Sequence, residues 1–260
     1  MLRITADAMH EKLSTGSAEI ILNGPPGDLR GHIFISNKNT DALKVKSLPL
    51  VHGNKIMDRM GVDNALRLSC KLNPGEEKIV ELLHQVHPLT APGTYESTIL
   101  VGGENRKVKM VIQEQMVIDI HPTSFTFTGT EPGKIHTASF TLTNLGNVAF
   151  QVPDVKHAAA LDMDMLCRAF GVAMRSSGAN GYENMLNEVS KNIQSNLPDW
   201  ASVNIAECGV ELQPGEGLLI HLSITIPKNC NPGKDYSGNI RFWDKDISYA
   251  IKSITPKMSK

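Results

Sequence analysis

A Pro-Gly motif that occurs twice is the feature of this sequence that most constrains its fold. Residues 72–76 read Leu-Asn-Pro-Gly-Glu, and residues 212–216 read Leu-Gln-Pro-Gly-Glu. A second Pro-Gly follows each copy at the same distance, because 92 − 74 and 232 − 214 both equal 18. A motif repeated at matched spacing indicates one supersecondary unit used twice.

Each copy predicts the order turn, strand, turn, strand. Pro presets φ and Gly accepts positive φ, so Pro-Gly is typical of a tight turn. Between the two turns of the second copy, apolar residues occupy every second position: Leu218, Ile220, Leu222 and Ile224. This period of two is typical of a strand with one buried face.

The repeat extends upstream to a strand that ends in Asn. Residues 33–37 (Ile-Phe-Ile-Ser-Asn) match residues 140–144 (Phe-Thr-Leu-Thr-Asn). The offset is 144 − 37 = 107 here and 214 − 74 = 140 at the Pro-Gly end, so the second copy holds 140 − 107 = 33 extra residues between these landmarks. Repeats commonly differ by insertions of this kind.

A tyrosine follows the second Pro-Gly turn in both copies, as Tyr95 and Tyr236. A tyrosine at the start of a strand suits the tyrosine corner of a sandwich, in which the hydroxyl bonds to nearby backbone. The alternative is a tyrosine used for its strand propensity alone. Since the residue recurs, we favour the corner.

These motifs together resemble immunoglobulin-like sandwich modules. The order of strand-Asn-turn, Leu-x-Pro-Gly-Glu and Pro-Gly before Tyr is similar to the bacterial modules of surface and glycosidase-associated proteins. It is equally similar to the cytosolic modules of the major-sperm-protein type. Neither group has a shared catalytic residue, so the resemblance implies a binding or spacer module.

The predicted fold is all-β, with two tandem immunoglobulin-like sandwiches at residues 1–115 and 116–260. The join at residues 113–116 lacks Gly, Pro and Ser, so we expect a stiff connection. From residue 157 to 176 the apolar period becomes helical, and a second helical pattern follows Asn180 and ends at Pro198. We therefore expect a helical hairpin at about 157–200, inserted in the second sandwich.

This hairpin is the predicted partner-binding surface. Its first helix is apolar around most of its girth, which either buries it on more than one side or leaves a patch for a partner. The first copy folds without such an insertion, which favours the interface. The candidate contact residues are Met163, Met165, Leu166, Phe170, Met174, Tyr182, Met185, Val189 and Ile193.

No motif for an enzyme, a cofactor or a metal stands out. His84 and His87 are three apart, so on a strand they point to opposite faces. Asp235, Asp244 and Asp246 could gather Ca²⁺, but Asp is also a common turn residue, and we favour turns. The formal net charge of −1 and the lack of a basic cluster argue against nucleic acid, and no apolar run is long enough to span a bilayer.

Cysteine usage and the N-terminus bear on the compartment. The four cysteines, Cys70, Cys167, Cys208 and Cys230, show neither paired nor metal-site spacing. We expect four thiols in a reducing compartment, with a Cys208–Cys230 bridge as the alternative. The N-terminus does not read as a signal peptide, so a cytoplasmic or other reducing location is favoured unless a leader was removed.

The sequence thus predicts a non-enzymatic structural or adaptor subunit that contacts protein partners in a larger assembly. The alternative is a glycan-binding or enzyme-accessory module at the cell surface. Only Trp200 and Trp243 are available as aromatic platforms for a glycan, and Trp243 is a better candidate for the core.

Overall fold

The computed structural model describes residues 13–50, 65–158, 163–176, 181–196 and 201–254. The chain divides into two compact units. The first holds Met1–Val117 together with Asn144–Ala149 and Gln213–Gly215. The second holds Ile118–Thr143, Phe150–Leu212 and Glu216–Lys260. Short segments from the second copy of the repeat therefore count with the first unit.

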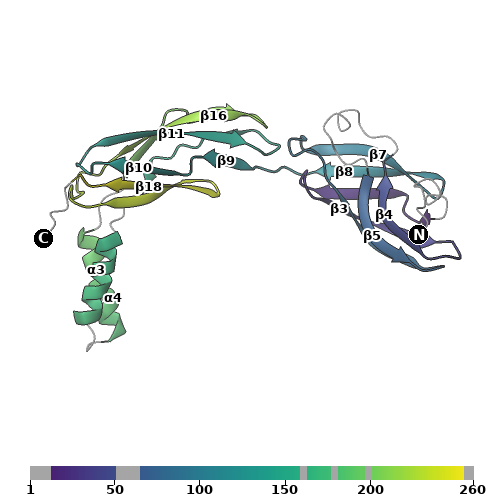
Figure 1. Ribbon diagram of the computed structural model, residues 1–260, viewed down its shortest axis with the longest axis horizontal. Helices are drawn as coiled ribbons and strands as arrows, with labels where there is room; N and C mark the ends of the chain where they lie inside the picture. Colours follow the sequence, from purple (N-terminus) through teal and green to yellow (C-terminus); the bar gives the residue numbers. More distant parts are fainter. Residues whose placement is uncertain (1–12, 51–64, 159–162, 177–180, 197–200, 255–260) are drawn as a thin grey trace. The chain divides into compact units, whose positions relative to one another are not determined.

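The first unit is an all-β sandwich in which the first two strands pair with different main partners. Its strands are β1 (Leu13–Thr15), β2 (Glu19–Gly24), β3 (Leu29–Asn37), β4 (Leu43–Pro49), β5 (Ala65–Leu72), β6 (Glu77–His84), β7 (Gly93–Val101) and β8 (Glu104–Ile112). They follow the order β4-β5-β6-β3-β2-β8-β7, and β1 lies on β3. Strand β1 pairs antiparallel with β3, and β2 pairs parallel with β8 and, at its end, antiparallel with β3; β3 and β8 are labelled in Figure 1.

The core of the first unit follows from the predicted alternation. Along β6, Val80, Leu82 and His84 are buried while the residues between them are exposed. Strand β3 opposes β6 in antiparallel register and buries Leu29, Ile33 and Ile35 on the same side. Period-two burial on both strands gives the sandwich one apolar interior.

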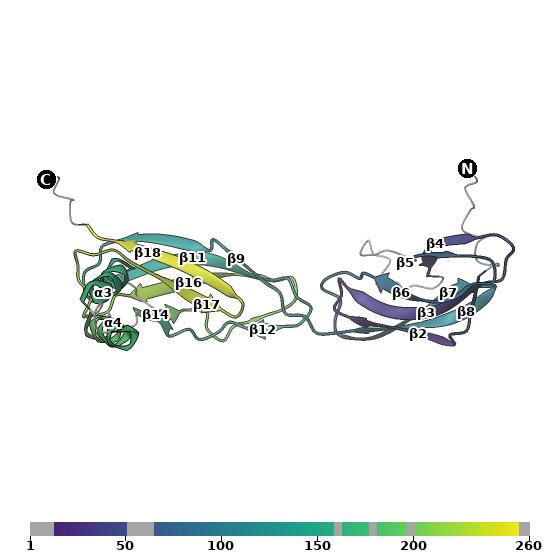
Figure 2. The same cartoon turned by 90° about the horizontal axis from the view of Figure 1, so that it is seen from below.

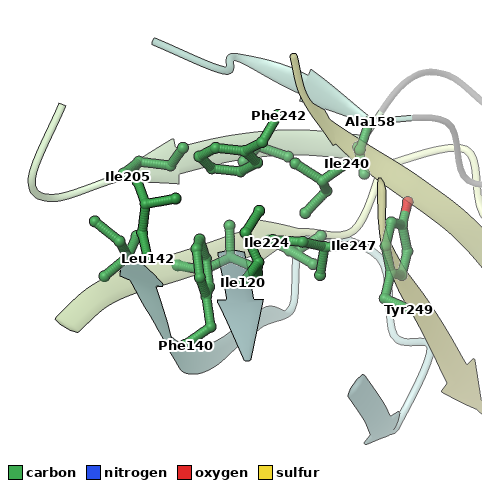
Figure 3. Close-up of a cluster of buried hydrophobic side chains, with 14 of the residues drawn as sticks. Ile120, Phe140, Leu142, Ala158, Ile205, Ile224, Ile240, Phe242, Ile247 and Tyr249 are labelled. Atoms are coloured by element: carbon green, nitrogen blue, oxygen red, sulfur yellow. The ribbon is translucent and has the colours of Figure 1, made fainter. Parts of the chain in front are cut away.

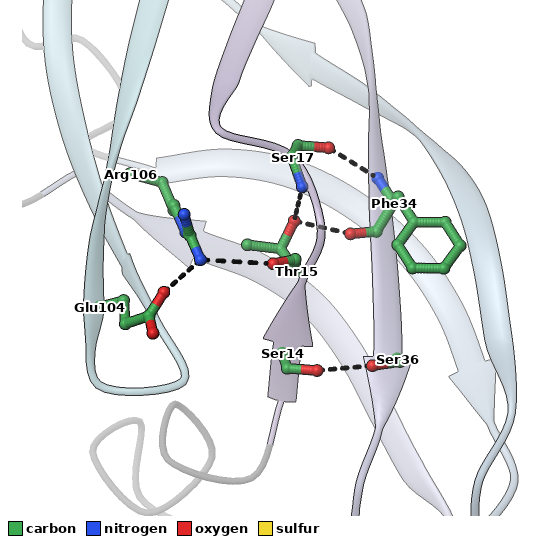
Figure 4. A network of polar contacts seen from close by, with 7 residues as sticks. All are labelled: Ser14, Thr15, Ser17, Phe34, Ser36, Glu104 and Arg106. Atoms are coloured by element: carbon green, nitrogen blue, oxygen red, sulfur yellow. Dashed lines mark hydrogen bonds and ion pairs between the residues drawn. The ribbon is translucent and has the colours of Figure 1, made fainter.

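Polar contacts hold the place where the first strand changes layer (Figure 4). The Thr15 hydroxyl donates to the Phe34 carbonyl at 2.7 Å and accepts from the Ser17 N–H at 3.2 Å. The Arg106 guanidinium donates to the Thr15 carbonyl at 3.4 Å and pairs with Glu104. These bonds satisfy backbone groups that leave the β-ladder at the crossing.

The second unit repeats this topology with more, shorter strands. They are β9 (Ile118–His121), β10 (Ser124–Thr128), β11 (Ile135–Asn144), β12 (Phe150–Gln151), β13 (His157–Ala158), β14 (Ala201–Ile205), β15 (Glu211–Leu212), β16 (Gly217–Thr225), β17 (Tyr236–Phe242) and β18 (Lys245–Lys252). The sheets have the orders β13-β14-β16-β11-β9, β10-β18-β17 and β12-β15 (Figure 2). As in the first unit, the first two strands pair with different main partners: β9 lies beside β11, and β10 runs parallel to β18.

An aromatic centre fills the interior of the second unit (Figure 3). Phe140 and Phe242 meet edge to face with their ring centroids 5.4 Å apart, and both are buried. Trp243 lies in the turn after β17, partly buried, with its ring 4.9 Å from that of Phe150. Trp243 therefore packs on the core, as expected, and is not an exposed platform.

Most strand pairings of the two units correspond, although the short β2–β3 pairing of the first unit has no counterpart between β10 and β11. The antiparallel β3–β6 pair matches β11–β16, and the β7–β8 hairpin matches β17–β18. Tyr95 in β7 and Tyr236 in β17 therefore occupy equivalent strands. The chain is thus an all-β protein of immunoglobulin-like sandwiches with a small helical insertion.

A buried asparagine joins the two halves of the repeated motif. The Asn37 carbonyl accepts from the Gly75 N–H at 2.9 Å, and the Asn144 carbonyl accepts from the Gly215 N–H at 2.8 Å. The Asn37 amide also donates to the carbonyls of Asp41, Leu72 and Asn73 at 2.8, 3.2 and 3.1 Å. The strand-Asn and Pro-Gly motifs recur together because each needs the other to satisfy its backbone.

The helical hairpin lies between β13 and β14 and consists of α3 (Met163–Ser176) and α4 (Tyr182–Asn196) (Figure 1). The equivalent connection in the first unit, between β4 and β5, lies at residues 51–64, outside the described residues. The prediction that helix begins at residue 157 is wrong. His157 and Ala158 pair with Ser202 and Ala201, so strand pairing overrides their helical period.

None of the four cysteines, all of which fall in the described ranges, forms a disulfide. Cys208 is exposed and Cys230 is buried, so the alternative bridge between them is absent. Among the helix residues that the structure describes, no helix has the length and apolar character needed to cross a bilayer.

Candidate functional site: the helical hairpin

Small and branched side chains join the two helices of the hairpin. Ala169 and Ala173 of α3 and Val189 of α4 are buried, and the two helices pack on each other. Residues four apart lie on one face of a helix, so the two alanines form one stripe. Because alanine has a short side chain, this stripe lets α4 approach closely, while Phe170 and Met174 of α3 stay exposed.

Four of the larger apolar side chains that the structure describes in the hairpin are exposed. Phe170 and Met174 of α3 are 47% and 65% exposed, and Tyr182 and Leu186 of α4 are 73% and 41% exposed. Each pair is spaced four residues apart, so each forms a short stripe along its own helix. We call these four residues the hairpin face.

Helix geometry places the two stripes on the same side of the hairpin. At 100° per residue, Phe170 and Met174 are rotated by about 100° from the buried alanine stripe. Leu186 is rotated by about 60° from Val189, and Tyr182, seven residues before Val189, by only about 20° in the same direction. Because α3 and α4 run in opposite directions, rotations of the same sign bring both stripes to one side. Val172, which is 45% exposed, is rotated the other way and lies on the opposite side.

The nine predicted contact residues have different environments. Phe170, Met174 and Tyr182 are exposed, and Met185 and Ile193 are half-buried. Val189 is buried, so it stabilises the hairpin and cannot contact a partner directly. Met163, Met165 and Leu166 belong to α3, but their side chains lie outside the described residues. Leu186 was not among the predicted contacts, although its spacing from Tyr182 identifies it.

Both tyrosine hydroxyls bond to backbone just upstream of their strands. Tyr95 donates to the Ala91 carbonyl at 2.9 Å. Tyr236, which is 4% exposed, accepts from the Asn231 N–H at 2.7 Å and donates to the Asn231 carbonyl at 3.3 Å. Bonds from the hydroxyl to backbone a few residues upstream are those expected of a tyrosine corner, and Tyr236 makes two of them where Tyr95 makes one.

The other sequence candidates are engaged elsewhere. His84 is buried with Nδ1 3.3 Å from the Ala65 carbonyl, and His87 accepts from the Leu89 N–H at 3.3 Å. Asp235 lies at one end of the β17–β18 hairpin, bonded to Lys252, while Asp244 and Asp246 lie at the other. The described part of the chain holds no group of three His, Cys, Asp or Glu arranged around a metal position.

Comparisons with known proteins do not assign this chain to a family. No family model matches this chain, and no curated protein matches it. Among solved structures it is similar to a Porphyromonas gingivalis W83 protein of unknown function, with 11% identity, 93% of this chain and 99% of that chain covered, and a TM-score of 0.25. It is also similar to the ASH / PapD-like domain of human CEP192, with 13% identity, 53% and 84% covered, and a TM-score of 0.28. A third is the Pseudomonas aeruginosa CupB2 chaperone, with 8% identity, 91% and 98% covered, and a TM-score of 0.26.

At this distance the comparisons carry no functional argument. The assignment to the immunoglobulin-like class therefore rests on the strand pairings described above.

Proposed function

We propose that this protein is a non-enzymatic adaptor or structural subunit that binds a protein partner through the hairpin face. The observation that carries the proposal is the exposure of Phe170 and Met174 on α3 and of Tyr182 and Leu186 on α4, two pairs of large apolar side chains at four-residue spacing. Contiguous exposed apolar side chains with this spacing mark interaction sites. The domain assignment that goes with the proposal is 1–115 and 116–260.

The length of the connection that holds the hairpin supports this role. The first unit makes the same strand pairings with a connection of 64 − 50 = 14 residues between Leu50 and Ala65. The second unit has 200 − 158 = 42 residues between Ala158 and Ala201. Long insertions with structure of their own are commonly functional.

The shape and chemistry of the hairpin face indicate the kind of partner. Two parallel stripes at four-residue spacing form a shallow apolar strip, which complements the apolar stripe of an amphipathic helix. Phe170, Met174 and Leu186 carry no polar group and Tyr182 carries one hydroxyl, so the affinity of the hairpin face depends mainly on apolar burial. We therefore propose an amphipathic helix of the partner as the occupant.

The free energy gained when a partner covers the hairpin face determines how much a substitution there should weaken binding. Burying one large apolar side chain fully is worth about 1.5–3 kcal/mol, so covering four that are about half exposed contributes on the order of 4 kcal/mol. Removing two of them should cost about 2 kcal/mol, which is roughly a 30-fold rise in Kd.

The test compares complexes isolated from the source by native mass spectrometry. The double variant Phe170→Ser/Met174→Ser should lose its stoichiometric partner, because both side chains are exposed and their loss leaves the fold intact. Replacing residues 159–200 by a short Gly/Ser loop should have the same effect while keeping β13 and β14. The matched control is Leu219→Ser, at a leucine of β16 that is 52% exposed. Retention of the partner by the double variant would overturn the proposal.

A further inference from the structure

We propose a second site on this chain, a binding site for a neutral saccharide on the outward face of the five-stranded sheet of the second unit. The face is hollowed there, with a volume of about 320 Å³ between β11, β14 and β16. Ligand sites of proteins begin at about this size. The proposal is independent of the hairpin and of any protein partner.

Short polar side chains form the floor of the hollow. Across the three strands, Asn204, Ser223 and Thr137 lie in one row of the register. Ser139 and His221 lie opposite each other in the next row. Residues that face each other across antiparallel strands have Cβ atoms about 5 Å apart. The sheet therefore brings three hydroxyls, one amide and one imidazole together on one surface.

Glu207 fixes the orientation of His221. One Glu207 carboxylate oxygen lies 2.6 Å from His221 Nδ1, and the other accepts the His221 backbone N–H at 2.7 Å. Burial disfavours the Glu207 carboxylate, but these two hydrogen bonds outweigh burial and lower the pKa of Glu207. With Nδ1 occupied, Nε2 is the ring nitrogen left for a ligand.

The first unit shows that the fold does not require this hollow. By the register, Arg30 and Leu83 occupy the places of Thr137 and Ser223, and His32 and Glu81 occupy those of Ser139 and His221. Arg30 and Glu81 form an ion pair at 3.5 Å over that surface. The same strands thus carry long side chains in one copy and short hydroxyls in the other.

The chemistry of the lining selects the ligand class. The hollow has no Lys or Arg to bind an anion and no Phe, Tyr or Trp on which a base or a sugar ring could stack, so a ligand there is held by hydrogen bonds. Glu207 is engaged by His221, so a cation finds one imidazole and no free carboxylate. Hydroxyls, an amide and an imidazole both donate and accept hydrogen bonds, which matches the hydroxyl groups of a sugar. Ser139 has no hydrogen bond to His221 among the described contacts, so the arrangement suits binding and not nucleophilic attack.

The experiment is an amide NMR titration of the full chain with four probes: methyl glucoside, methyl galactoside, methyl mannoside and N-acetylglucosamine. We expect at least one probe to shift the signals of Ser139, Asn204, His221 and Ser223, with a Kd in the millimolar range, because an open polar site gains little per hydrogen bond.

Two variants and one control make the result decisive. His221→Ala should raise Kd at least tenfold. Ser223→Leu introduces the residue that the first unit has at the equivalent place, Leu83, and should abolish binding while the His221–Glu207 pair stays in place. His32→Ala, an exposed histidine of the first unit, should leave binding unchanged. No shift with any probe at 50 mM, or equal shifts in Ser223→Leu, would overturn the proposal. Neither result bears on the hairpin face.

Discussion

Replacing Asn37 by Ala tests why the repeated motif contains an asparagine. Asn37 is 1% exposed, and its amide donates toward three backbone carbonyls. Its side-chain oxygen accepts the Asn39 N–H at 3.0 Å. Alanine removes all of these bonds and supplies no other partner for the groups.

The expected cost follows from the number of groups left without a partner. The two amide hydrogens and the side-chain oxygen of Asn37 make about three net hydrogen bonds, each worth about 1 kcal/mol. A buried carbonyl that is left without a hydrogen bond costs about 1–3 kcal/mol of folding stability, and a water molecule that enters the loop recovers part of this. We expect Asn37→Ala to lower the free energy of unfolding of the first unit by about 3 kcal/mol.

Urea unfolding measures this loss. With a slope of about 2 kcal/mol per molar urea, the transition of the first unit should move down by roughly 1.5 M. The matched control is Asn73→Ala, because Asn73 is exposed and its described bonds use its backbone. A loss below about 1 kcal/mol, or one equal to that of Asn73→Ala, would refute the reasoning.

Three further predictions concern the second unit and the thiols. Tyr236→Phe should cost about 1–2 kcal/mol of unfolding free energy and Tyr95→Phe about 0.5, because only Tyr236 is fully buried; equal losses in urea would contradict this. The lowered pKa of Glu207 gives stability that is present above its unfolded value of 4.5 and lost as pH falls through the folded value. The stability difference between wild type and Glu207→Gln should therefore shrink from pH 6 to pH 3, and a constant difference would argue against a stabilising role for the hydrogen bonds to the Glu207 carboxylate. Thiol titration of the denatured, unreduced protein should count four, and a count of two would reveal a bridge.

Strand positions could be predicted from the sequence because alternation and turns are local signals. The predicted alternation of Leu218, Ile220, Leu222 and Ile224 falls within β16. The matched positions of Asn37 and Asn144 were also visible. Their role was not, because the carbonyls that Asn37 satisfies come from residues up to 36 positions away. A sequence pattern shows which residues recur and leaves open which backbone groups need a partner.

For the hairpin, the apolar periodicity predicted the helices but not which of their side chains are buried. The first helix is apolar around most of its girth, so its pattern did not show which side is buried. The structure buries Ala169 and Ala173 and leaves Phe170 and Met174 exposed. The closest helix contact selects the smallest residues, which hydrophobicity alone does not rank. The His221–Glu207 pair was not predicted, because a loop brings together residues 221 − 207 = 14 apart.

The hairpin face is tested most directly by photo-crosslinking from Cys167. Cys167 is exposed on α3, and helix geometry places it on the same side as Phe170 and Met174. A benzophenone attached there, in a variant with Cys208→Ser, should form one adduct with the native partner. The same group on Cys208, which is exposed in the turn after β14, should form none when Cys167 is replaced by Ser. Phe170→Ser/Met174→Ser should abolish the Cys167 adduct. An equal yield from the two cysteines, or an adduct that survives the double substitution, would contradict the assignment of the hairpin as the partner-binding element.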